Sequence, residues 1–166
     1  MRVGLLDADL CWGNHANGRR YGKTKADIFP NLVLMKLSAY HKQRGDDVSL
    51  YMSFEQYDRV YISKVFSTTP IDRQVIFANE IYFGGSGFCI ELVDGKEVYR
   101  HPEYNPFTGH LMYHTEAGIR TDPTRSGQKY IYTENLPYEI EHMMPDYSLY
   151  PTIKDTAYGW LLLLPR

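Results

Sequence analysis

Short apolar runs at regular intervals constrain the first half of this chain more than any other feature of its sequence. Each run has the length and composition of a buried strand, and together they are residues 2–8, 48–52, 59–66 and 80–87. A segment of helical periodicity separates the first run from the second, so these two strands are expected to be parallel and joined by a right-handed crossover. The pattern predicts an α/β fold with an open, mostly parallel sheet.

Two helices and one long loop are expected between these strands. Residues 29–45 place apolar side chains at helical spacing, with Pro30 suited to the first turn and Gly45 suited to the cap at the end. The apolar stripe of this helix is Phe29, Leu32 or Val33, Leu37 and Tyr40. A short helix is predicted at 70–79, and residues 10–27 have no periodicity, which indicates a loop.

The regular pattern stops after residue 88. Residues 89–100 are expected to form a hairpin, because Asp94-Gly95 is a strong two-residue turn signal. The following residues are rich in Pro, Gly, Thr, Tyr and His, with at most one further hairpin near 129–133. The chain is therefore divided into an α/β domain at 1–90, an inserted segment at 91–134 and a final segment at 135–166.

Charge and composition exclude several classes of protein. The net charge of −2 argues against a nucleic-acid partner, which would call for a basic surplus. No apolar run approaches the roughly 18 residues that span a bilayer, and the first residues do not resemble a signal peptide. A cytoplasmic protein without a membrane partner is therefore expected. The 15 tyrosines and the tail WLLLLPR suggest self-association, although tyrosines also suit a half-buried sheet.

Candidate binding residues follow two of the predicted strands. Asp7 and Asp9 come at the end of the first strand, where they would hold a metal or a ribose, or simply cap the next loop. Gly84, Gly85, Ser86 and Gly87 would let the backbone approach a phosphate or a cofactor tail, or would form a tight turn. A phosphate loop would also need a lysine and a following helix, which this segment lacks.

Histidines supply a weaker hypothesis, a metal-dependent hydrolase. His110 and His114 are four residues apart, and His101 and Glu116 are close in sequence. The zinc motif with this spacing needs a glutamate directly after the first histidine, and Leu111 stands there. No nucleophile motif is present either, so no residue is predicted to be catalytic and no metal site is expected. A basic cluster, which would meet a phosphate or remain solvated, is Arg19, Arg20, Lys23 and Lys25.

Several stretches together show a family resemblance. They are MRVGLLDAD, FPNLVLMKLSAYHKQRGDDV, YDRVYISKVFSTTP, EIYFGGSGF, LPYEIEHMMPDYSLYP and DTAYGW. Their order and spacing resemble the N-terminal region of a family of bacterial radical S-adenosylmethionine proteins, across residues 1–88 and 135–160. In that family a cobalamin-binding, flavodoxin-like domain precedes the radical domain. The resemblance thus implies a flavodoxin-like sheet at 1–90 and a linker toward a radical domain at 135–166.

The resemblance also implies which cofactors this chain would lack. The family's C-x3-C-x2-C motif holds a [4Fe–4S] cluster that binds S-adenosylmethionine, but this chain ends at Arg166 without it, and Cys11 and Cys89 do not match. The pattern D-x-H-x-x-G, which cobalamin-binding domains that ligate cobalt carry after the first strand, is absent too, because His15 lies eight residues beyond Asp7. We therefore expect a truncated accessory domain that binds no cofactor and works beside a catalytic radical domain.

The alternative is a free-standing module that binds a nucleotide, or a corrinoid without histidine ligation. Its binding residues would be Asp7, Asp9, Ser63, Gly84, Gly85, Ser86 and Gly87.

Overall fold

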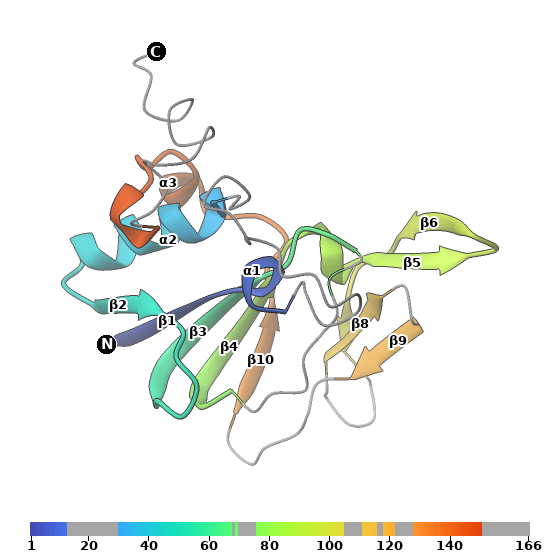
Figure 1. Ribbon diagram of the computed structural model, residues 1–166, viewed down its shortest axis with the longest axis horizontal. Helices are drawn as coiled ribbons and strands as arrows, with labels where there is room; N and C mark the ends of the chain where they lie inside the picture. The colour runs from blue at the N-terminus through green and yellow to red at the C-terminus, as the bar shows by residue number, and fades with distance from the viewer. Residues whose placement is uncertain are drawn as a thin grey trace.

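Five parallel strands form the central sheet of the protein (Figure 1). The computed structural model describes residues 1–12, 30–67, 69, 76–104, 111–115, 118–121 and 128–150. The strands are β1 (Arg2–Asp7), β2 (Asp47–Leu50), β3 (Tyr57–Ser63), β4 (Ala78–Gly84) and β10 (Lys129–Tyr132), in the order β10-β4-β3-β1-β2. The sequence predicted the first four strands and their parallel arrangement, and the structure confirms this mostly parallel α/β sheet.

The fifth strand differs from the prediction. Residues 129–133 were expected to form a hairpin, but Lys129–Tyr132 pairs in parallel with β4, with Lys129 opposite Glu80. Alternation of polar and apolar residues indicates a strand, but it does not identify the strand's partner. The sheet therefore draws its edge strand from a segment far along the chain from β4.

Helix α2 (Leu32–Gln43) covers one face of the sheet, together with the short α3 (Tyr138–Glu141) (Figure 1). Asn31 caps α2, because its side chain accepts a hydrogen bond from the backbone N–H of Leu34. Pro30 thus precedes the cap, and its predicted place in the first turn is wrong. The predicted stripe is also partly wrong, since Leu32 and Val33 are exposed. The buried positions of α2 are Leu34, Met35, Leu37, Ser38 and His41.

The two faces of the sheet belong to two apolar clusters. Val3 and Leu5 of β1 pack against Leu34 and Met35 of α2, and we call this side the α2 face. Leu6 points to the opposite face, where it joins the apolar side chains of β3 and β4. Side chains alternate along a strand, so the register assigns every second residue of β3 and β4 to the α2 face.

Two smaller antiparallel sheets precede β10 in the sequence. Strands β5 (Ile90–Val93) and β6 (Lys96–Tyr99) form the predicted hairpin, and positive φ angles at Asp94 (51°) and Gly95 (75°) confirm its turn. Strands β7 (Glu103–Tyr104), β8 (Leu111–Thr115) and β9 (Gly118–Thr121) form a three-stranded sheet. Within the described residues, short 3-10 turns span Ser86–Phe88 and Tyr147–Leu149.

Two further predictions concern segments that the structure describes only in part. The predicted loop at 10–27 begins inside helix α1 (Ala8–Trp12), and its remainder lies outside the described residues. Of the helix predicted at 70–79, positions 70–75 lie outside them, whereas Ala78 and Asn79 already belong to β4. Within the described ranges, every helix is too short or too polar to cross a bilayer.

Candidate functional site

The parallel register brings three of the predicted binding residues to one edge of the sheet. Asp7 lies opposite Ser63, and Ser63 lies opposite Gly84, each as the last residue of its strand. We call this the carboxyl edge. Ligands of open parallel sheets bind beyond this edge, so the sequence placed these side chains correctly, although their role as ligand contacts stays a prediction.

Asp7 is engaged inside the protein. Its side chain is 3% exposed, and its Oδ2 accepts a hydrogen bond of 2.6 Å from the hydroxyl of Tyr150. Its Oδ1 accepts a second bond, of 3.2 Å, from the backbone N–H of Leu10. Burial raises the pKa of Asp7 to about 6, because loss of water penalises the charged form more than these hydrogen bonds compensate. Tyr150 thus covers the carboxyl end of β1.

Asp9 and Ser63 also have partners within the chain. The carboxylate of Asp9 accepts hydrogen bonds from the backbone N–H of Val65 (2.7 Å) and from the hydroxyl of Thr69 (2.6 Å), which orders the segment after β3. The hydroxyl of Ser63 accepts a hydrogen bond of 2.8 Å from the side chain of Asn31. Asn31 therefore links the start of α2 to the end of β3.

The glycine turn after β4 packs against the segment after β3. Gly85 has a φ of +102°, and a Cβ there would lie 2.2 Å from the carbonyl oxygen of Lys64. A Cβ at Gly87 would lie 2.7 Å from Cγ of Lys64. Ser86 adds a hydrogen bond of 2.9 Å to the carbonyl oxygen of Val65. These residues therefore allow two stretches of the same chain to approach closely, as the tight-turn alternative expected.

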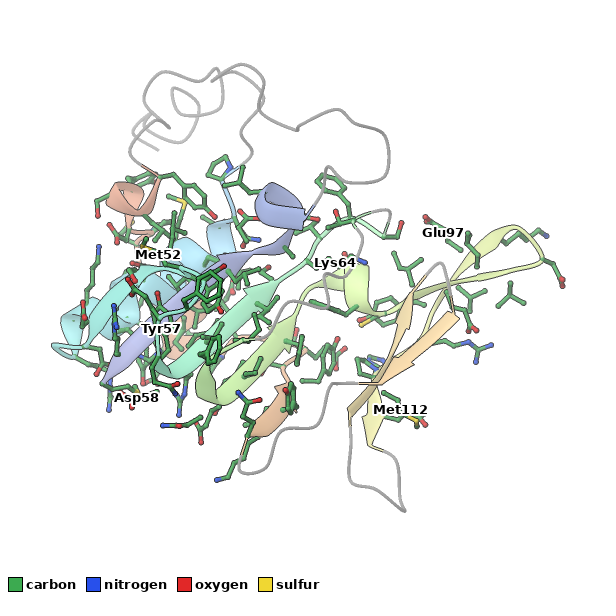
Figure 2. The ribbon with its side chains drawn as sticks, turned by 60° about the horizontal axis from the view of Figure 1, so that its bottom comes forward. Met52, Tyr57, Asp58, Lys64, Glu97 and Met112 are labelled. Carbon is green, nitrogen blue, oxygen red and sulfur yellow. The ribbon has the colours of Figure 1, made fainter. Side chains whose placement is uncertain are left out.

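Lys64 holds the two segments together, and the sequence analysis did not single it out. Its side chain is 1% exposed, and its ammonium group donates hydrogen bonds to the carbonyl oxygens of Gly87 (2.9 Å) and Ser67 (3.2 Å). Figure 2 shows Lys64 beside the 3-10 turn Ser86–Phe88. A lysine inside an apolar run is the signal that would have drawn attention to this position.

A cavity of about 420 Å³ lies on the α2 face, over β3 and β4. Its walls are α2, the end of β3, the end of β4 and residues 133–141, which include α3. Ser63, Gly84 and Gly85 line it, so three of the seven predicted binding residues reach the cavity. The other four, Asp7, Asp9, Ser86 and Gly87, are not among its lining residues. The sequence missed the contribution of residues 133–141, because they follow the misassigned strand β10.

Tyr61 and Tyr82 form the aromatic floor of the cavity. Both project from the α2 face, because they share a register row with Leu5, and their ring centroids are 5.0 Å apart. Arg59 donates 2.9 and 2.5 Å hydrogen bonds to Glu80 and one of 3.2 Å to the hydroxyl of Tyr61. Arg59 and the two rings line the end of the cavity near the start of β3.

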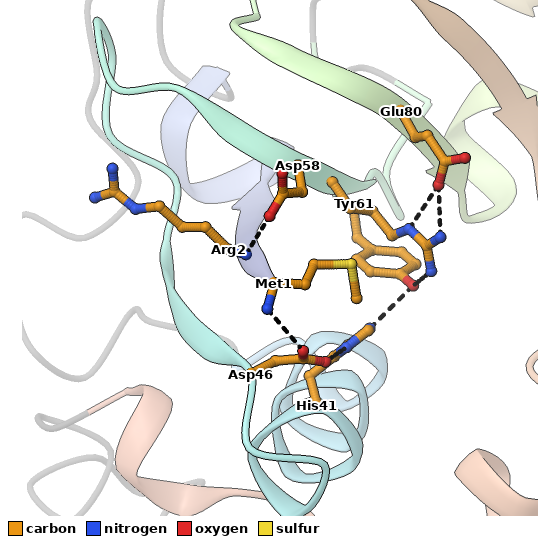
Figure 3. A network of polar contacts seen from close by, with 8 residues as sticks. Met1, Arg2, His41, Asp46, Asp58, Tyr61 and Glu80 are labelled. Atoms are coloured by element: carbon orange, nitrogen blue, oxygen red, sulfur yellow. Dashed lines mark hydrogen bonds and ion pairs between the residues drawn. The ribbon is translucent and has the colours of Figure 1, made fainter.

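A chain of polar contacts fixes Tyr61 from behind (Figure 3). Nε2 of His41 lies 3.0 Å from the Tyr61 hydroxyl, and Nδ1 lies 2.7 Å from Asp46. Asp46 in turn pairs with the N-terminal ammonium group at 3.2 Å. Burial lowers the pKa of His41, more than its contact with Asp46 raises it. A neutral His41 that donates to Asp46 through Nδ1 therefore accepts a hydrogen bond from Tyr61.

Most residues of the histidine hypothesis lie outside the part of the chain that the structure describes. His110, the basic cluster at 19–25 and the apolar tail lie outside the described residues, and so does the side chain of His114. His101 is described, with Nδ1 at 3.8 Å from Oε1 of Glu134. Among the described side chains, no three of His, Cys, Asp or Glu gather as they would around a metal ion.

Fold and site together define a parallel α/β domain with a cavity on its helix-covered face. Comparisons of the sequence with family models and with curated proteins, and of the structure with solved structures, give no match.

Proposed function

We propose that this chain is a binding domain of the flavodoxin-like class that holds a small organic molecule and has no catalytic chemistry of its own. Strand order supports the class. Counted along the chain, the five parallel strands lie in the order 2-1-3-4-5, which is the order of flavodoxin-like sheets. In such sheets ligands bind beyond the carboxyl ends, near the point where the strand order reverses.

The cavity under α2 and α3 is the observation that carries the binding role. Its volume of about 420 Å³ falls within the range of roughly 300–1,000 Å³ that is typical of small-molecule sites. Aliphatic side chains of α2 face an aromatic floor, and a few polar groups lie at the ends, as such sites require. Ser63, Gly84 and Gly85 place one end of this cavity at the carboxyl edge.

A tryptophan at the mouth of the cavity is expected to abolish binding. Val33 lines the cavity and is 41% exposed, so Val33→Trp adds bulk there without disturbing the core. Leu32→Trp is the matched control, because Leu32 is 44% exposed in the same helical turn and is not a lining residue. The measurement is the melting temperature of the full chain with nucleosides, nucleotides, flavins, corrinoids and aromatic amines.

We expect at least one compound to stabilise wild type and Leu32→Trp but not Val33→Trp. A ligand at a hundred times its Kd adds about 2.7 kcal/mol to the free energy of unfolding. That gain corresponds to a rise of roughly 5–10 °C for a domain of this size. Flat melting curves across the panel, or an equal shift in Val33→Trp, would refute binding in this cavity.

We also propose that the domain serves a radical S-adenosylmethionine catalytic domain, as its sequence resemblance suggests. A surface suited to a partner favours this role, because four large apolar side chains next to the carboxyl edge are 41–47% exposed. They are Leu32, Val33, Val65 and Phe66.

An accessory domain of this kind would not assemble an iron–sulfur cluster by itself. Anaerobic reconstitution of the purified chain with iron and sulfide is expected to leave its visible absorbance unchanged. A stable brown protein with about four irons per chain would contradict the accessory role, since such a cluster needs its own thiolate ligands.

A further inference from the structure

The charged residues around the cavity are predominantly acidic. Its lining contains three carboxylates, Glu134, Glu139 and Glu141, and one guanidinium, that of Arg59. Arg59 is paired with Glu80, and Glu141 is paired with Lys36 at 2.7 Å. The charges of the two partners, Glu80 and Lys36, cancel one another. Among the described residues, the three carboxylates and one guanidinium of the lining therefore leave an excess of two negative charges.

The charges are also distributed unevenly along the cavity. Arg59, which is paired with Glu80, lines the end near the start of β3, where its guanidinium lies 4.8 Å from the ring centre of Tyr82. Glu134 is the second residue after β10 and lies near the carboxyl edge, because the backbone N–H of Thr133 donates to the carbonyl oxygen of Phe83 and the carbonyl oxygen of Thr133 approaches Gly84. Glu139 projects from α3, which spans Tyr138–Glu141. One end is thus an internally neutralised ion pair. The other carries the exposed carboxylates of Glu139 and of Glu134, whose Oε1 lies 3.8 Å from Nδ1 of His101.

The floor between these ends is aromatic and uncharged. Burial raises the pKa of both Tyr61 and Tyr82 above the usual value of a phenol, so both side chains are neutral at pH 7. Leu34 and Leu37 of α2 are buried and face the same space. A flat apolar body therefore fits between α2 and the two rings.

We infer that the cavity takes an organic cation, a molecule with a flat apolar body and an ammonium group that meets Glu134 and Glu139. This inference rests on the proposed binding function and narrows its ligand. Phosphate-bearing ligands are disfavoured, because each carboxylate near the mouth repels an anion by about 1 kcal/mol at 4 Å in water. The cavity wall thus argues against the nucleotides that the glycine turn suggested from the sequence.

The test compares two compounds that share an indole ring but carry opposite charges, tryptamine and indole-3-propionate. Their affinities for the full chain are measured by calorimetric titration at low salt and again at high salt. We expect tryptamine to bind at least tenfold more tightly, and its affinity to fall as salt screens the carboxylates.

Charge-neutral variants test whether Glu134 and Glu139 cause the preference for the cation. Glu134→Gln with Glu139→Gln is expected to weaken tryptamine binding about tenfold and to leave indole-3-propionate unweakened. The matched control is Glu97→Gln with Glu103→Gln, which makes the same charge change at exposed positions that do not line the cavity. Figure 2 shows Glu97 on the projecting hairpin, far from α2.

Equal binding of the two compounds, or an unchanged preference in Glu134→Gln with Glu139→Gln, would overturn the inference. If either result is obtained and Val33→Trp abolishes the binding of both compounds, the cavity binds ligands without selecting cations. The proposed function then stands. If neither compound binds at millimolar concentration, the cation preference is wrong. The thermal panel with Val33→Trp then decides separately whether the cavity binds anything.

Discussion

Gly85→Ala lowers the free energy of unfolding by about 4 kcal/mol, the largest effect that we expect from a single substitution. At φ +102° and ψ 150° the backbone of Gly85 occupies a region that other residues essentially avoid, which costs roughly 1–3 kcal/mol. The new Cβ would also lie 2.2 Å from the carbonyl oxygen of Lys64, and relief of such overpacking costs a further 1–3 kcal/mol or so. Urea denaturation followed by circular dichroism measures the loss.

Gly95→Ala separates the two contributions. Gly95 also has a positive φ, +75°, but a Cβ there would meet nothing within 4 Å. Its substitution is expected to cost about 1 kcal/mol, through the backbone conformation alone. If the two variants lose equal stability, the close approach of Gly85 to Lys64 is not what requires glycine in this turn.

Asp7→Asn changes the dependence of stability on pH. The folded pKa of Asp7 is raised to about 6 from 3.8, so the folded state binds a proton more tightly than the unfolded state. The resulting stabilisation is fully present below about pH 4 and is lost as pH rises through 6. A difference of about two pKa units corresponds to about 3 kcal/mol. Asparagine carries no charge. Its amide oxygen can accept the hydrogen bond from the N–H of Leu10, and its amide NH2 group can donate to the hydroxyl oxygen of Tyr150.

We therefore expect the stability of Asp7→Asn, relative to wild type, to increase by about 2.4 kcal/mol between pH 4 and pH 7.5. Taking the difference between the two proteins removes the contributions of other titrating groups, such as His41. Asp47→Asn is the control, because its side chain is 78% exposed and the charge change is the same. A difference that stays constant with pH for Asp7→Asn would show that the pKa of Asp7 is not raised in the folded protein.

The sequence revealed the carboxyl edge because local signals mark strand ends. Asp7 and Gly84 each close a recognisable apolar run, and parallel pairing brings such ends together whatever the rest of the chain does. Asn31 was also within reach of sequence reasoning, since an Asn directly before an apolar periodic segment is a standard cap signal.

The partners of Tyr150 and Lys64 were beyond such reasoning. Tyr150 reaches Asp7 across 143 residues of sequence, and nothing local distinguishes it from the other tyrosines. Lys64 is an ordinary surface residue type whose burial depends on carbonyl groups that a second loop supplies. Contacts of this kind arise from tertiary packing, so spacing and composition do not encode them.

The cavity escaped prediction for the same reason. Its outer wall, residues 133–141, takes its position from β10, and β10 was assigned to a separate hairpin. Because the pairing of β10 was predicted wrongly, the site was expected at the carboxyl edge alone and not on the α2 face.

The parallel pairing of β4 with β10 limits how this protein can be shortened. The chain leaves β4 at the carboxyl edge and must return to the opposite edge before β10 begins. In most parallel sheets a crossover helix makes this return, and about a dozen residues are the minimum. Here the segment with the hairpin and the three-stranded sheet makes it instead. Engineering or evolution can exchange that segment for another connector, but cutting it to a tight turn would remove the outermost strand and, with it, the outer wall of the cavity.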